Sequence, residues 1–97
     1  MASYTIARLI SRSKLIDESG GIEERVIWAV PKSARHPEGV RYRLAYIPKG
    51  AGRPAVLYDN HHPKGHHRHI GERQFSYDFT GVERLLEDFR RDIEAIE

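Results

Sequence analysis

Residues 80–97 read TGVERLLEDFRRDIEAIE, and this stretch decides the fold class. Its apolar side chains recur at the spacing of an α-helix: Val82, Leu85, Leu86, Phe89, Ile93 and Ile96. Thr80 and Glu83 fit a capping box, in which each side chain accepts a bond from the backbone N–H of the other residue. We therefore predict an amphipathic α-helix over residues 81–96. Such a helix must bury its apolar stripe against another element.

Strand patterns precede the helix. Runs that are rich in β-formers, or that alternate apolar and polar side chains, cover residues 4–16, 22–30, 40–47, 55–60 and a short segment near 74–79. Turn clusters separate several of these runs, and the first two runs predict a hairpin. The predicted fold class is α+β. We expect one small domain over residues 1–97, an antiparallel β-meander of four to five strands with the C-terminal helix packed on one face.

Composition excludes several classes of protein. Of the 97 residues, 39% are hydrophobic and 31% are charged, which is typical of a globular chain. The chain has no cysteine, which excludes disulfides, cysteine-ligated zinc and thiol catalysis. No apolar run reaches the roughly 18 residues of a membrane helix, and no signal-peptide pattern is present. We therefore expect a cytoplasmic protein without a membrane partner. A core this small also favours a homo-oligomer.

Charge is distributed unevenly. Residues 32–73 carry nine Lys or Arg against three acidic residues, a net charge of +6, and they hold all six histidines. Residues 80–97 carry three Arg against six acidic residues, a net charge of −3. The basic zone favours either a polyanion-binding face or ordinary charged surface. The outer face of the helix is interpreted as solvated, or as a docking place for a basic partner segment, through Glu87, Asp88, Asp92 and Glu94.

Residues 58–71, YDNHHPKGHHRHIG, carry the candidate chemistry as a loop that follows a strand. Cleavage of RNA through its 2′-hydroxyl needs a base, an acid and cations, and His, Lys and Arg provide them. On an extended segment His67 and His69 point the same way and Arg68 points the opposite way. The predicted catalytic residues are His67, His69, Lys64 and Asp59. The predicted substrate-binding residues are Arg43, Arg68, Tyr58 and Asn60.

Three alternatives stay open at this point. His67 and His69 could chelate a metal ion, with His61, His66 or Asp59 completing the ligand set. The basic and tyrosine side chains could instead bind nucleic acid without chemistry. The segment could also be a solvated basic hairpin in which glycines serve the backbone turns. We favour metal-independent RNA cleavage over these three alternatives, and we expect neither a metal nor an organic cofactor.

The same segment resembles the TumE family of small toxins from prokaryotic toxin–antitoxin operons. The matching residues are Tyr58, Asp59, Asn60, Lys64, Gly65, His67, Arg68 and His69. Further similarity covers Tyr42-Arg43-Leu44, IEERVIWAVP at 22–31 and LLEDFRRDI at 85–93, while His66 departs from the family pattern. The resemblance implies the toxin component of a type II system, neutralised by a cognate antitoxin that often carries a DNA-binding helix-turn-helix. RNA is the expected substrate by analogy with other small toxins.

Overall fold

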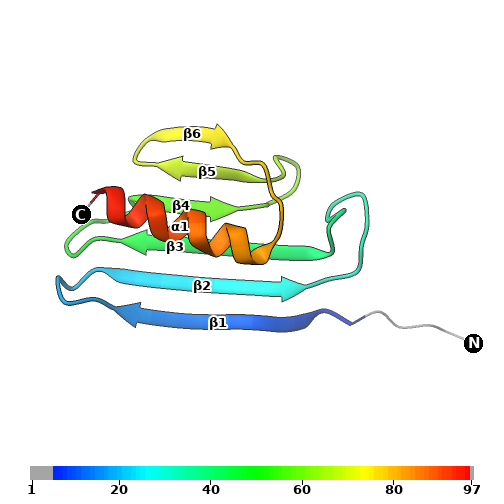
Figure 1. Cartoon of the computed structure of the whole chain (residues 1–97), viewed down its shortest axis with the longest axis horizontal. Helices are drawn as coiled ribbons and strands as arrows, with labels where there is room; N and C mark the ends of the chain where they lie inside the picture. Colours follow the sequence, from blue (N-terminus) through cyan, green and yellow to red (C-terminus); the bar gives the residue numbers. More distant parts are fainter. Residues whose placement is uncertain (1–5, 97) are drawn as a thin grey trace, which may run out of the picture.

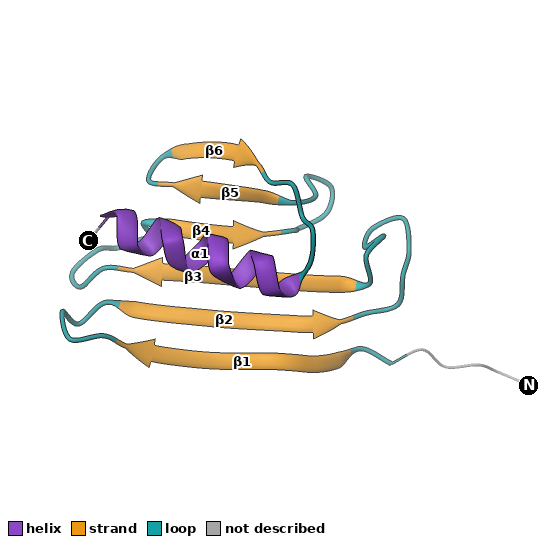
Figure 2. Ribbon diagram, in the orientation of Figure 1, coloured by secondary structure: helices purple, strands orange, loops and turns teal. Residues whose placement is uncertain are grey.

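An antiparallel sheet with a helix across one face makes up the computed structural model, which describes residues 6–96 (Figure 1 and Figure 2). Six strands lie side by side in chain order. Their bounds are β1 Arg8–Ile16, β2 Ile22–Ala29, β3 Val40–Ile47, β4 Val56–Asp59, β5 His67–Ile70 and β6 Arg73–Ser76. The helix α1, Val82–Ile96, lies over β3 and β4 (Figure 1). The predicted α+β meander with a C-terminal helix is therefore confirmed.

The number of strands differs from the prediction of four to five. The additional strand is β5, His67–Ile70, in the segment that was predicted as a loop. β5 pairs with β4 on one side and β6 on the other, so hydrogen bonds to two neighbours stabilise a short, polar stretch. β6 ends at Ser76, and Tyr77 and Phe79 leave the sheet to pack against the core. The first two residues of the predicted 4–16 strand lie outside the described residues.

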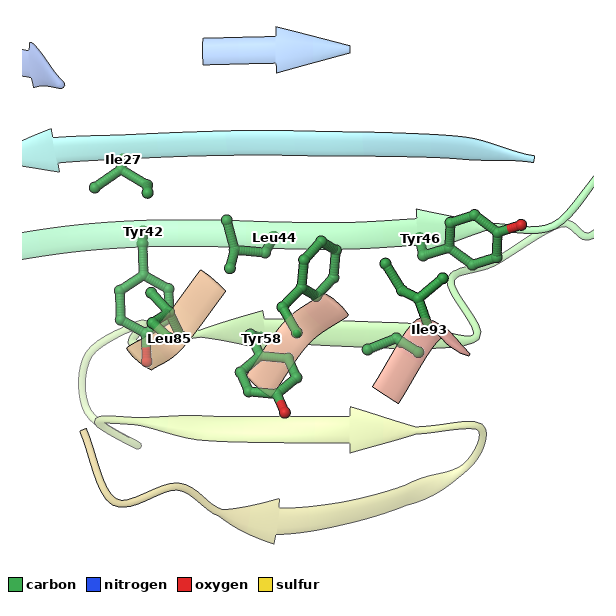
Figure 3. Close-up of a cluster of buried hydrophobic side chains, with 9 residues drawn as sticks. Ile27, Tyr42, Leu44, Tyr46, Tyr58, Leu85 and Ile93 are labelled. Atoms are coloured by element: carbon green, nitrogen blue, oxygen red, sulfur yellow. The ribbon is translucent and has the colours of Figure 1, made fainter. Parts of the chain in front are cut away.

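The core fills the space between α1 and the sheet. Leu85, Phe89 and Ile93 are the buried side chains of the helix, while Val82 and Leu86 of the predicted apolar stripe are partly buried and Ile96 is 42% exposed. They meet side chains that point from one face of three strands (Figure 3): Ile27, Tyr42, Leu44, Tyr46, Val56 and Tyr58. Because strand side chains alternate, the residues between these point to the opposite face of the sheet. The helix therefore leaves one sheet face open.

The start of the helix differs from the predicted capping box. α1 begins at Val82, and the Gly81 carbonyl accepts the first bond from the Leu85 N–H at 3.0 Å. Gly81 has a φ of 136°, a conformation that glycine adopts without a Cβ clash, and it lets the chain turn from β6 into the helix. Gly81 therefore occupies the N-cap position, and Thr80 lies one residue too early to cap.

Charged side chains of α1 also bind it to the rest of the fold. Asp88 accepts a hydrogen bond from the Tyr77 hydroxyl at 2.7 Å. Arg90 reaches β2, where its Nη2 lies 3.0 and 2.9 Å from the two carboxylate oxygens of buried Glu23. The prediction that Asp88 and Asp92 belong to an outer docking face is wrong, because both are half-buried and hydrogen-bonded inward. No helix within residues 6–96 is long and apolar enough to cross a membrane.

Candidate functional site

The β4–β5 hairpin divides the predicted site residues between the two faces of the sheet. Asp59 is the cross-strand neighbour of His67, and Tyr58 is the neighbour of Arg68. Directly opposed residues of an antiparallel pair share a face. Because Tyr58 points into the core under α1, Arg68 shares that face, whereas Asp59 and His67 lie on the open face.

Asp59 and His67 form a tightly held pair. The His67 Nε2 lies 3.0 Å from Asp59 Oδ1, and its Nδ1–H donates to the Gly65 carbonyl at 2.8 Å. The side chains are 7% exposed for His67 and 17% for Asp59. Both ring nitrogens therefore face acceptors, and these two contacts fix the orientation of the ring. Asp59 therefore holds and orients the His67 ring.

His69 is the histidine that stays available. Its ring lies on the same face as His67, with 5.1 Å between the ring centroids. Within residues 6–96 its imidazole has no hydrogen-bond partner, and the side chain is half-buried. Partial burial lowers the pKa of His69, and the nearby charges of His67 and Lys64 lower it further, against an opposing effect of Asp59. A neutral imidazole at neutral pH can accept a proton.

Lys64 lies in the β4–β5 loop, close to His69. Its Nζ donates to the Gln74 side-chain oxygen at 3.3 Å, and Gln74 is the direct cross-strand neighbour of His69. The ammonium group is exposed and therefore accessible to an anionic ligand. The structure thus brings together the four predicted catalytic residues: Asp59, Lys64, His67 and His69.

Arg43 extends the site along the sheet. It is the cross-strand neighbour of Asp59, so it lies on the open face beside the Asp59–His67 pair. The guanidinium is exposed and forms no ion pair with another residue of the range 6–96. An unpaired guanidinium next to the histidines is suited to bind a phosphate group.

Tyr58 and Arg68 lie away from this cluster. The Tyr58 hydroxyl donates to Asp92 Oδ2 in α1, and Arg68 Nη1 donates to the same oxygen at 2.9 Å. Burial raises the pKa of Tyr58, and the bond to Asp92 adds to the effect. These contacts join the helix to the sheet, and the predicted substrate-binding roles of Tyr58 and Arg68 stay predictions.

Asn60 is buried, and its amide binds backbone. Its side-chain oxygen accepts from the Tyr42 N–H at 2.9 Å, and its side-chain nitrogen donates to the Val40 carbonyl at 2.8 Å. Asn60 thereby continues the β3–β4 pairing beyond the last residue of β4. A role in binding substrate stays a prediction for this residue.

His66 is part of the packing on the helix side. Its Nδ1 lies 2.9 Å from the Tyr42 hydroxyl, and its Nε2 lies 2.9 Å from Glu38. The ring stacks on Phe79 with centroids 4.6 Å apart. The hydrogen bond between His66 and Glu38 is the main cause that lowers the pKa of Glu38.

Within residues 6–96, no three His, Asp or Glu side chains are grouped so that they could hold a metal ion.

Sequence reasoning missed Trp28. This side chain is half-buried, lies on the open face, and lines a cavity together with Arg41, Arg43 and Asp59. The signal was present in the alternation of two strands. Trp28 shares a face with Val26 in β2, and it is the cross-strand neighbour of Arg41 in β3, where arginines alternate with the buried tyrosine and leucine.

Comparisons with known proteins bear on the family. The family model described as "Toxin TumE" matches residues 6–97, which is nearly the whole chain. No curated protein and no solved structure is significantly similar to this chain. The match covers the hairpin with Asp59, His67 and His69 as well as the helix. The chain therefore belongs to the TumE family of toxins.

Proposed function

We propose that this toxin cleaves single-stranded RNA by metal-independent attack of a ribose 2′-hydroxyl, at His69 on the open face. The observation that carries the proposal is the state of His69. Its imidazole is half-buried and free of hydrogen bonds within residues 6–96, and its lowered pKa favours the neutral form. It lies beside Lys64 and the Asp59–His67 pair. A neutral imidazole can act as the general base, and neighbouring cations can stabilise the negative charge of the transition state.

The reaction is assigned to three groups. Neutral His69 takes the proton of the 2′-hydroxyl, and the 2′-oxygen attacks the adjacent phosphorus. Lys64 and Arg43 stabilise the charge on the phosphorane. The bond from phosphorus to the 5′-oxygen breaks, and the Lys64 ammonium gives that oxygen a proton. The products are a 2′,3′-cyclic phosphate and a 5′-hydroxyl, and exchange with water restores both side chains.

His67, which was predicted together with His69 to be catalytic, is assigned a positioning role. Both of its nitrogens are engaged, and its ring is 7% exposed, so a phosphodiester has little access to it. Its position next to His69 contributes to the lowered pKa of His69. Asp59 in turn holds the His67 ring in place.

A cleavage assay tests the proposal. Purified protein without a His-tag is incubated with single-stranded RNA, with and without a chelator, and the new ends are analysed. We expect cyclic phosphate ends under both conditions, and roughly a hundredfold slower cleavage by His69→Gln. His62→Gln is the matched control, because His62 is exposed in the same hairpin and outside the cluster. RNA left intact by the wild type, or activity lost on chelation, would contradict the proposal.

One observation favours a second function, a toxin that binds RNA without cleaving it. Of the two predicted catalytic histidines, one is tied on both nitrogens. Under this alternative, growth arrest on induced expression persists in the double variant His67→Gln/His69→Gln, and cellular RNA stays intact. Under the cleavage proposal, the double variant loses toxicity and the wild type fragments RNA.

A cognate antitoxin is the partner that membership of a toxin family suggests. We propose that it neutralises this chain by direct binding, as in a type II system. Co-expression of the neighbouring open reading frame of the operon should restore growth and co-purify with the toxin. Restored growth without a complex would count against a type II system.

A further inference from the structure

The open face carries a cavity next to the proposed catalytic cluster. It has a volume of about 500 Å³, and its lining includes Trp28, Arg41, Arg43 and Asp59. Asp59 belongs to both the cavity and the pair with His67. A ligand group in this cavity would therefore lie beside the site proposed for RNA cleavage.

Trp28 is positioned to act as a flat wall of this cavity. It is the one tryptophan of the chain, and it lies outside the buried core cluster. Its cross-strand neighbours are Leu9 on β1 and Arg41 on β3, which flank the indole along the sheet. A half-buried indole held between two strands offers a rigid surface for stacking.

The charges around Trp28 favour an anionic ligand. Arg41 and Arg43 are exposed, and neither forms an ion pair with another residue of the described part of the chain. They alternate along β3 with side chains of the core, so both guanidinium groups project from the open face. An aromatic wall beside unpaired cations is the arrangement that binds the bases and phosphates of single strands.

We propose that this cavity binds one unpaired nucleobase of single-stranded RNA, stacked on Trp28, while Arg41 and Arg43 contact the neighbouring phosphates. The choice of RNA rests on the proposed function. The cavity and the histidine cluster lie on the same face and are linked through the cross-strand neighbours Arg43, Asp59 and His67, so one single strand can extend from Trp28 towards His69. The subsite thus places the chain of the substrate across the histidine cluster.

Fluorescence of the single tryptophan reports directly on this contact. The full-length protein is titrated with short 2′-O-methyl oligoribonucleotides, which lack the nucleophilic hydroxyl and cannot be cleaved. We expect saturable quenching by single-stranded oligonucleotides. Duplexes of the same sequence should quench much less, since their bases are already stacked. Equal quenching by duplex and single strand, or no quenching, overturns the inference.

Variants separate stacking from folding. Binding of a labelled oligonucleotide is measured by anisotropy, and folding by circular dichroism. Trp28→Leu should weaken binding by about tenfold, whereas Trp28→Phe, which keeps an aromatic face, should stay close to the wild type. Phe75→Leu is the matched control, because Phe75 is 39% exposed on the helix side of the sheet. A folded Trp28→Leu that binds as the wild type does overturns the inference.

Salt dependence tests the two arginines. Arg41→Gln and Arg43→Gln should each reduce the slope of log affinity against log salt by about 0.7, the value for one phosphate contact on a single strand. Unchanged slopes would remove the arginines from the subsite. These binding readouts do not depend on turnover. Binding at Trp28 without any cleavage would refute the nuclease alone, and cleavage that is indifferent to Trp28→Leu would refute the subsite alone.

Discussion

The Asp59–His67 pair makes a sharp prediction about coupling energy. The two atoms lie 3.0 Å apart, and the side chains are 7% and 17% exposed. The Gly65 carbonyl fixes the other side of the ring, so little side-chain entropy is lost when the pair forms. A hydrogen bond to a charged group in such a setting stabilises a fold by about 1.5–3 kcal/mol. Asp59→Asn should therefore lower the melting temperature by about 10 °C for a chain of this size.

A double-mutant cycle measures the pair itself. Asp59→Asn, His67→Gln and the double variant are unfolded with urea, and the coupling energy is expected to be about 2 kcal/mol. Arg53 and Glu72 serve as the control pair, because their atoms lie 4.0 Å apart and their side chains are 79% and 89% exposed. Their coupling should stay within about 0.5 kcal/mol. If the two couplings are equal, Asp59 does not hold His67, and the positioning argument for the site fails.

Three further predictions concern the hydrophobic core, the turn between β1 and β2, and His69 as the proposed general base. Phe89→Ala should lower the free energy of unfolding, measured with urea, by about 3–5 kcal/mol. Leu86→Ala should lower it less, because Leu86 is only half-buried, and equal decreases would contradict the central place of Phe89 in the core. Hydrogen bonds from Ser19 and Tyr46 lower the pKa of Asp17 from 3.8 to about 2, so its contribution to stability is present above pH 3.8 and is lost as pH falls towards 2. Asp17→Asn should flatten this acid limb of the unfolding curve, and an unchanged limb would remove Asp17 as its cause. Because the pKa of His69 is lowered from 6.5 and the base acts when neutral, kcat/KM for RNA should fall as pH drops through a value below 6.5; a limb above 6.5 would assign the base elsewhere.

Local periodicity was sufficient for much of the fold. The helix and the long strands each bury one face, so their apolar residues recur at a spacing that can be read directly. β5 could not be found in this way. Its four residues, His67–Ile70, are mostly basic, and they become a strand because β4 and β6 supply backbone partners on both sides. Such pairing depends on contacts between segments, which no local pattern encodes.

The candidate site could likewise be predicted only in part from the sequence. Alternation along an extended segment correctly predicted that His67 and His69 share a face and that Arg68 points away. The hydrogen-bond partners of the polar side chains could not be predicted from this alternation. Only the folded arrangement shows that Asn60 binds the backbone of β3 and that Asp92 engages Tyr58 and Arg68. Residue type alone could not separate a ligand-binding polar group from one that joins a helix to a sheet.

The acidic helix explains how a chain with a net charge of only +2 can present a basic surface. On the helix side, Arg68 pairs with Asp92. On the open face, five cations form no ion pair with any other residue in the range 6–96: Arg12, Lys14, Arg41, Arg43 and Lys64. Neutralisation on one face therefore leaves an uncompensated positive potential on the other, which under the proposed function attracts RNA towards His69. Reversing the acidic charges of α1 would disturb the helix contacts first, whereas removing the five open-face cations would, under the proposed function, weaken RNA binding with the fold intact.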